Sequence, residues 1–164
     1  MDPTSPEAQT ELARRHKAAA TTVLGLLVAT VLLSVVAFLA TPYFTEQPNR
    51  VIDMAVRIVV LTLGLGSVVW RRTKFNAMRL QDIAGLAGVT GLLKTLEKTT
   101  IQLALIGTAI ASVGFVTTLI SGFASYTYWT GTVAAVVFVY CYPTKQSWLR
   151  ALYRFTEKPA GESV

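Results

Sequence analysis

Long apolar runs, separated by polar segments, dominate the chain. Four of them cover residues 18–40, 51–70, 99–120 and 126–142. A helix needs about 20 mainly apolar residues to cross the roughly 30 Å hydrocarbon core of a bilayer, and each run is close to that length or longer. The pattern therefore predicts an all-α membrane protein with four transmembrane helices. The second run gives the weakest signal, because it alone contains charged residues.

The connections between these runs predict two helical hairpins in an up-down four-helix bundle. Two of the connections are short and lie on the same side, so the first run should pair with the second and the third with the fourth. The third connection is long and lies on the opposite side. The predicted parts are an N-terminal tail over 1–17, a transmembrane domain over 18–142 with a connecting segment at 71–98, and an amphipathic segment and tail over 143–164.

The distribution of positive charge predicts the orientation. Of the 15 Lys and Arg residues, all but Arg50 and Arg57 lie in the two terminal parts or in the 71–98 segment. Positive charge stays on the cytoplasmic side of a membrane, so both termini and that segment should be cytoplasmic. With no targeting segment, the expected location is a bacterial inner membrane. The residues expected at the lipid interface are Arg14, Arg15, Lys17, Arg71, Arg72, Trp148 and Arg150.

Composition narrows the range of partners. Charged residues make up 15% of the chain, below the usual share of about 25% in soluble domains. The net charge is +6, but the Lys and Arg residues that produce it flank the apolar runs and do not form one basic face. We therefore expect no nucleic-acid partner. The expected partners are the lipid bilayer and either other membrane subunits or a second copy of the chain.

Two segments outside the runs have amphipathic patterns. Apolar residues recur near helical spacing between 75 and 96, which predicts a helix that lies partly on the membrane surface. After Pro143, Thr144 can cap a second helix, in which Trp148 and Leu152 would face lipid. The ends, residues 1–10 and 158–164, are expected to be disordered.

Small residues mark one side of the third run. They recur at steps of three or four, the spacing that places them on one helix face. In a bilayer, helices associate through close backbone approach over small residues. This seam should therefore pack against a neighbouring helix, in the same chain or in another one. Its members are Ala104, Gly107, Ala111, Gly114, Thr118 and Ser121, and the same spacing occurs once each in the pairs Gly25–Ala29 and Gly131–Ala135.

Asp53 and Arg57 are the ionisable residues nearest to membrane depth. They stand four residues apart, so a helix places their opposite charges side by side. One interpretation is a pair that neutralises itself near the outer end of the second helix. The other is a role in proton or cation movement, since intramembrane charges are functional candidates.

Few residues could support other chemistry. His16 is the only histidine and is expected to carry interfacial charge, while the only cysteine, Cys141, is expected to be buried. One histidine without nearby carboxylates or thiols predicts no metal site, no cofactor and no hydrolytic triad. Gly85, Gly88 and Gly91 lack the context of a phosphate-binding loop, so they predict a turn or close packing.

The order of these features resembles small bacterial four-helix membrane proteins of unassigned function, which are similar to two fused hairpins of a rotary-ATPase proteolipid. The resemblance covers most of residues 14–152. It implies the four-helix architecture. Proteolipids work through a membrane-embedded carboxylate, however, and the third and fourth runs contain none. The matching residues are Arg14-Arg15-His16-Lys17, Arg71-Arg72, the stretch from Ala104 to Gly114, Tyr142-Pro143 and Trp148-Leu149.

Three functions remain open at this stage. The favoured one is a non-catalytic accessory, structural or assembly subunit of a larger membrane complex, on the strength of the small-residue seam. The second is a small oligomeric transporter or channel that uses Asp53 and Arg57. The third is a lipid-modifying enzyme acting through Asp82 or Glu97, which is weakest because those carboxylates are isolated in the sequence.

Overall fold

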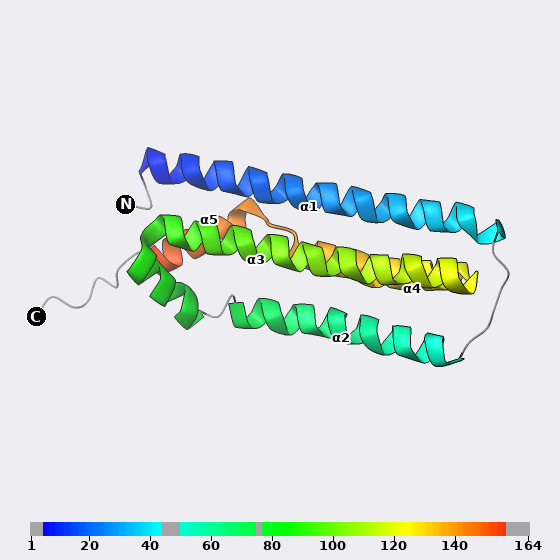
Figure 1. Cartoon of the computed structure of the whole chain (residues 1–164). Helices are drawn as coiled ribbons and strands as arrows, with labels where there is room; N and C mark the ends of the chain where they lie inside the picture. The colour runs from blue at the N-terminus through cyan, green and yellow to red at the C-terminus, as the bar shows by residue number, and fades with distance from the viewer. Residues whose placement is uncertain (1–4, 44–49, 75–76, 157–164) are drawn as a thin grey trace, which may run out of the picture.

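A computed structural model describes residues 5–43, 50–74 and 77–156, and these residues are helical almost throughout. The predicted all-α class is confirmed. Figure 1 shows the elements running back and forth along one direction. In chain order they are α1 (Pro6–Ala40), the short 3₁₀ helix η1 (Thr41–Tyr43), α2 (Arg50–Lys74), α3 (Ala77–Ser121), α4 (Ala124–Cys141) and α5 (Lys145–Thr156).

Three of these helices are long and apolar enough to cross a membrane. The qualifying stretches are Pro6–Tyr43, Arg50–Lys74 and Gly88–Ser121. They identify the chain as an integral membrane protein by length and composition. The 18 residues of α4 span about 27 Å, close to the thickness of the hydrocarbon core.

Helix α1 begins well before its apolar stretch. The Ser5 hydroxyl accepts a hydrogen bond from the backbone N–H of Ala8 at 3.2 Å, and Pro6 occupies the first turn, where its missing N–H costs nothing. The prediction of disorder over residues 1–10 is therefore wrong from Pro6 onward, while residues 1–4 lie outside the described part. At 35 residues α1 is about 52 Å long, so its N-terminal turns extend beyond a membrane core.

Helix α3 is the centre of the arrangement. It contacts α1, α2, α4 and α5, and Figure 1 shows α1 and α2 on opposite sides of the α3–α4 pair. The predicted pairing of the first two spans in one hairpin is therefore wrong. Each flanking helix packs on the central pair instead. Val23 of α1 packs with Ala104 and Phe138, whereas Val56 and Val60 of α2 belong to a cluster with residues of both α3 and α4.

Two glycines set the path of the chain around α3. Gly88 has φ 64° and ψ −167°, which kinks the helix after its first turns. Gly122 has φ 73° and turns the chain from α3 into α4. Both values lie in the left-handed region that glycine adopts without a steric penalty.

The 71–98 segment was predicted to connect two spans and to lie partly on the membrane surface, and the kink at Gly88 explains why its second half does not. Helix α2 continues to Lys74, and beyond Gly88 the helix runs without interruption through the third apolar stretch. Residues 89–98 are thus the first turns of a membrane-spanning helix and not a surface helix. Their apolar side chains, Val89, Leu92, Leu93 and Leu96, are buried inside the protein.

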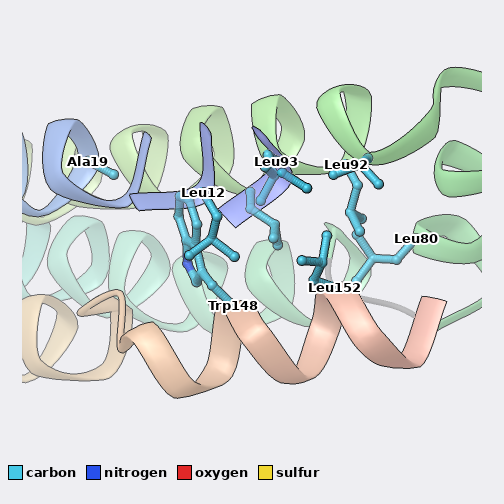
Figure 2. Close-up of a cluster of buried hydrophobic side chains, with 10 residues drawn as sticks. Leu12, Ala19, Leu80, Leu92, Leu93, Trp148 and Leu152 are labelled. Atoms are coloured by element: carbon cyan, nitrogen blue, oxygen red, sulfur yellow. The ribbon is translucent and has the colours of Figure 1, made fainter. Parts of the chain in front are cut away.

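A second apolar core lies near the beginning of α1, where α5, the last described helix, packs. Figure 2 shows Trp148 and Leu152 of α5 pointing towards Leu12 of α1 and Leu92 and Leu93 of α3. We call this core the terminal cluster. It comprises Ala8, Leu12, Ala19, Leu80, Val89, Leu92, Leu93, Leu96, Trp148 and Leu152.

The terminal cluster corrects the prediction that α5 rests on lipid. Trp148 is 3% exposed and Leu152 is fully buried, so neither faces the bilayer. The physical reason is that α1 and α3 offer α5 an apolar protein surface. Packing on that surface removes the indole ring and the leucine from water as effectively as lipid would.

Candidate functional site

All six residues of the small-residue seam are buried in the structure. Helix α4 of the same chain covers much of the seam. The Thr118 hydroxyl on α3 shares a hydrogen bond of 2.7 Å with the Thr127 hydroxyl on α4, and Ala111 lies in one cluster with Ala134. The seam is thus placed at an intramolecular helix contact.

Helices α3 and α4 approach each other closely at Gly114. A methyl group added there would lie 1.7 Å from Oγ1 of Thr130 and 2.7 Å from its Cβ. Gly107 is less tight, since an added Cβ would meet the Phe138 ring at 3.2 Å. Small residues at these positions therefore allow the two helix backbones to approach closely, as membrane helices require for stable packing.

Asp53 and Arg57 form an ion pair in the first turns of α2. Nε of Arg57 lies 3.1 Å from Oδ2 of Asp53, and the two side chains are 65% and 37% exposed respectively. They border a hollow of about 480 Å³ that α2 shares with the beginning of α4, where Tyr126 and Trp129 complete the wall. The arrangement can hold a small polar or charged group, but it lies at one end of the helices.

A larger and mostly apolar groove of about 560 Å³ runs between α1 and α4. Gly131 and Ala135 line it, whereas Gly25 and Ala29 lie on the exposed side of α1. Thr30 also borders the groove, and its Oγ1 is the one buried side-chain polar atom without a hydrogen-bond partner in the described part of the chain. The pair Gly131–Ala135 therefore lies in the groove, whereas the pair Gly25–Ala29 lies on the exposed surface of α1.

The residues predicted at the lipid interface fall into two groups. Arg14, Lys17, Arg72 and Arg150 are exposed, and Arg71 is partly exposed at the end of α2. Arg15 instead points into the protein, where its guanidinium donates to Glu11 at 2.6 Å and to Glu97 at 2.9 Å. This network joins the first turns of α1 to α3.

The same network affects the ionisation of Arg15. The hydrogen bond with Glu11 is the largest influence and raises the pKa of the guanidinium above its ordinary value, although burial opposes the effect. A raised pKa adds stability that is present below the unfolded pKa and is lost only as the pH rises through the folded pKa. Both values lie far above neutrality, so Arg15 keeps its charge in this network at physiological pH.

Sequence reasoning missed the part that His16 plays. Its Nε2 lies 2.8 Å from the carbonyl oxygen of Pro143, and its ring meets Trp148 edge-on at 5.6 Å between centroids. His16 is thus half-buried between α1 and the start of α5, and not simply an interfacial charge. The signal that could have found this face is the spacing of Ala8, Leu12 and Ala19, which continues the apolar side of α1 upstream of its uncharged run.

The other candidate groups are widely separated. Glu97 is held by Arg15, and the side chain of Asp82 lies outside the described residues. Cys141 is buried. Within the described ranges, no three His, Cys, Asp or Glu side chains come close enough together to hold a metal ion.

Comparison of the chain with known protein families, with curated proteins and with solved structures finds no match.

Proposed function

We propose that this chain is a non-catalytic integral membrane protein that serves as an accessory, structural or assembly subunit of a larger membrane complex. In this proposal it crosses a bacterial inner membrane four times, with both termini in the cytoplasm. The likeness to fused proteolipid hairpins then extends to the number of helices and not to ion transport.

The fourth crossing is supported by the packing of α4. This helix lies along α3 and contacts it more extensively than it contacts any other helix, through residues distributed from Thr127 to Phe138. If α3 crosses the bilayer, a helix of nearly the same length as the core that is bound alongside it should cross as well. The concentration of Lys and Arg at the end where α2 stops and α5 starts supports the cytoplasmic orientation.

The observation that carries the subunit role is the uneven burial of the spanning helices. In their most apolar stretches, α1 and α2 each bury 17% of their residues, against 44% for α3. The exposed side of α1 contains Gly25 and Ala29, and a Cβ added at Gly25 would meet nothing within 4 Å. Small residues at helix spacing on an exposed face suit the close approach of a further transmembrane helix.

Native mass spectrometry of the tagged protein, extracted in mild detergent at natural expression levels, tests this role. We expect a stoichiometric complex with other membrane proteins. Gly25→Leu should disrupt that complex without unfolding the chain, because Gly25 is exposed and a Cβ added there meets no atom within 4 Å. Gly66→Leu, the same change at an exposed position of α2, is the matched control. A monomer or a pure homo-oligomer would count against the subunit role.

A small oligomeric transporter or channel is the second candidate. The hollow beside Asp53 and Arg57 favours it, because an ion pair that is partly open to solvent can exchange its partner for a charged solute. Asp53→Asn should then abolish a transport phenotype, with Asp53→Glu retaining part of it. An unaltered phenotype in Asp53→Asn would exclude a transport role for this pair.

A further inference from the structure

A small cavity of about 100 Å³ lies where α2 ends, α4 ends and α5 begins. Its wall is partly polar, because one guanidinium and four residues with a hydroxyl group line it together with apolar side chains. Among the described residues that line it, none carries a carboxylate. The lining residues are Arg71, Leu96, Thr100, Leu103, Cys141, Tyr142, Pro143, Thr144, Ser147, Trp148 and Ala151.

The guanidinium of Arg71 is held in place at this cavity. It donates a hydrogen bond to the carbonyl oxygen of Tyr140 and lies 4.2 Å from the centre of the Tyr140 ring. A guanidinium has five N–H donors in a planar fork, and that fork matches the oxygens of a phosphate group. The two contacts with Tyr140 therefore orient a group whose planar shape suits an anion.

Two residues of the cavity wall offer neighbouring hydroxyl groups. Thr144 and Ser147 lie next to one another, with 2.6 Å between their hydroxyl oxygens. Both are exposed, so a group that enters from outside can reach them. Lys145 stands between them in the sequence and adds a positive charge at the surface. The polar part of the cavity wall thus combines hydroxyl groups with the guanidinium of Arg71, and Lys145 lies close by in the sequence.

The rest of the cavity is apolar. Leu103, Cys141 and Trp148 are each nearly inaccessible to solvent, and Trp70, Tyr140 and Tyr142 are partly exposed around the same end of the helices. Aromatic residues collect at the headgroup level of a bilayer, and basic pockets between helices on the cytoplasmic side bind anionic lipid headgroups. An anion with an attached apolar chain fits both sides of this cavity.

We propose that this cavity binds the phosphate group of an anionic phospholipid. Arg71 and the hydroxyls of Thr144 and Ser147 contact the phosphate oxygens, and the glycerol and acyl part lies against the apolar helix surface. The inference rests on the proposed membrane orientation of α2 and α4, because that orientation places the cavity at the inner headgroup level. It does not require a partner subunit.

Native mass spectrometry of the full chain, released from nanodiscs of phosphatidylcholine with or without phosphatidylglycerol, measures the retained lipid. We expect the unaltered protein to retain phosphatidylglycerol selectively. Arg71→Gln should weaken that retention about ten- to a hundredfold, as expected for losing hydrogen bonds to a charged group. Arg72→Gln makes the same change of charge at an exposed neighbour outside the cavity and should weaken it less than about fivefold.

A second pair of variants leaves the net charge unchanged. Ser147→Leu should block the cavity and reduce retention, whereas Gln146→Leu, an exposed neighbour that does not line the cavity, should not. Thermal unfolding followed by circular dichroism shows whether each variant is folded. If Arg71→Gln does not fold, the comparison of Ser147→Leu with Gln146→Leu tests the proposal alone. Equal lipid retention in these two variants would then overturn it.

Three results would overturn the proposal. Equal losses in Arg71→Gln and Arg72→Gln would show that general electrostatic attraction, and not this cavity, holds the lipid. Displacement of the lipid by millimolar inorganic phosphate would assign the cavity to a soluble anion. Unselective retention of both lipids would exclude an anion site. None of these results bears on the proposed subunit role, because the measurement uses the isolated chain.

Discussion

Replacing Gly114 by alanine tests a very close contact between α3 and α4. The new methyl carbon would lie 2.7 Å from Cβ of Thr130, a distance that no change of side-chain rotamer can relieve. The Thr130 side chain is also completely buried, and its hydroxyl donates to the carbonyl oxygen of Tyr126 at 2.8 Å. Helices α3 and α4 must therefore move apart to accept the substitution.

The size of the effect follows from two opposing contributions. Alanine is a better helix former than glycine by about 1 kcal/mol, which favours the variant. Inserting a methyl group into a tight contact costs about 1–3 kcal/mol, and a clash with a backbone-proximal carbon belongs in the upper part of that range. We expect a net loss of about 1–2 kcal/mol in the free energy of unfolding, which lowers the Tm by about 2–8 °C.

The buried Cys141 provides the assay. It is the only cysteine in the chain and is 4% exposed, so a maleimide dye that fluoresces on reaction reports unfolding in detergent. Gly25→Ala is the matched control, because its added methyl group meets no atom within 4 Å and should leave the Tm unchanged or slightly raised. Combining Gly114→Ala with Thr130→Ala removes two of the three close contacts and should restore part of the loss. Equal Tm values for Gly114→Ala and Gly25→Ala would refute the close approach of α3 and α4.

Three further substitutions probe other contacts. Gly107→Leu should destabilise the chain strongly, by separating α3 from α4, and should reduce both expression and thermal stability in detergent. Trp148→Ala should remove about 3–5 kcal/mol of packing in the terminal cluster and make α5 sensitive to limited proteolysis. Glu97→Gln should weaken the link from Arg15 to α3 by about 1 kcal/mol, which faster amide hydrogen exchange in the first turns of α1 would reveal.

Each of these substitutions has a control at an exposed position. Gly66→Leu adds the same side chain on α2, where a Cβ would meet nothing within 4 Å. Tyr153→Ala removes an aromatic ring of α5 that is 36% exposed, and Glu7→Gln removes an exposed carboxylate near the start of α1. Unchanged proteolysis in Trp148→Ala, or equal exchange rates in Glu97→Gln and Glu7→Gln, would contradict the assigned contacts.

The membrane-spanning stretches were readable from the sequence because hydrophobic length alone marks them. The third run and its small-residue face are clear examples, since a step of three or four residues places Gly107 and Gly114 on one side of any helix. The position of the partner helix was harder to foresee. Nothing in the sequence shows whether the second span packs beside the first or, as the structure has it, on the far side of α3.

The terminal cluster was mispredicted for a different reason. An amphipathic helix next to a membrane has the same pattern whether its apolar face meets lipid or protein, so Trp148 and Leu152 could not distinguish the two. The deciding facts were that α1 begins at Pro6 and that Gly88 leaves the following turns continuous with α3. These two facts concern where helices begin and continue. Charged residues such as Glu11 and Glu97 made the ends of the helices hard to predict, because in the structure they pair with Arg15 inside the protein.

The terminal cluster also has a consequence for the order of events during synthesis. It joins α1 to α5, so Leu12 meets Trp148 only after the ribosome has made all of the helices between them. Until then, the leucines of α1 and α3 that pack against α5 form an uncovered apolar surface. A product truncated before Lys145 would keep that surface, and quality-control machinery can recognise it.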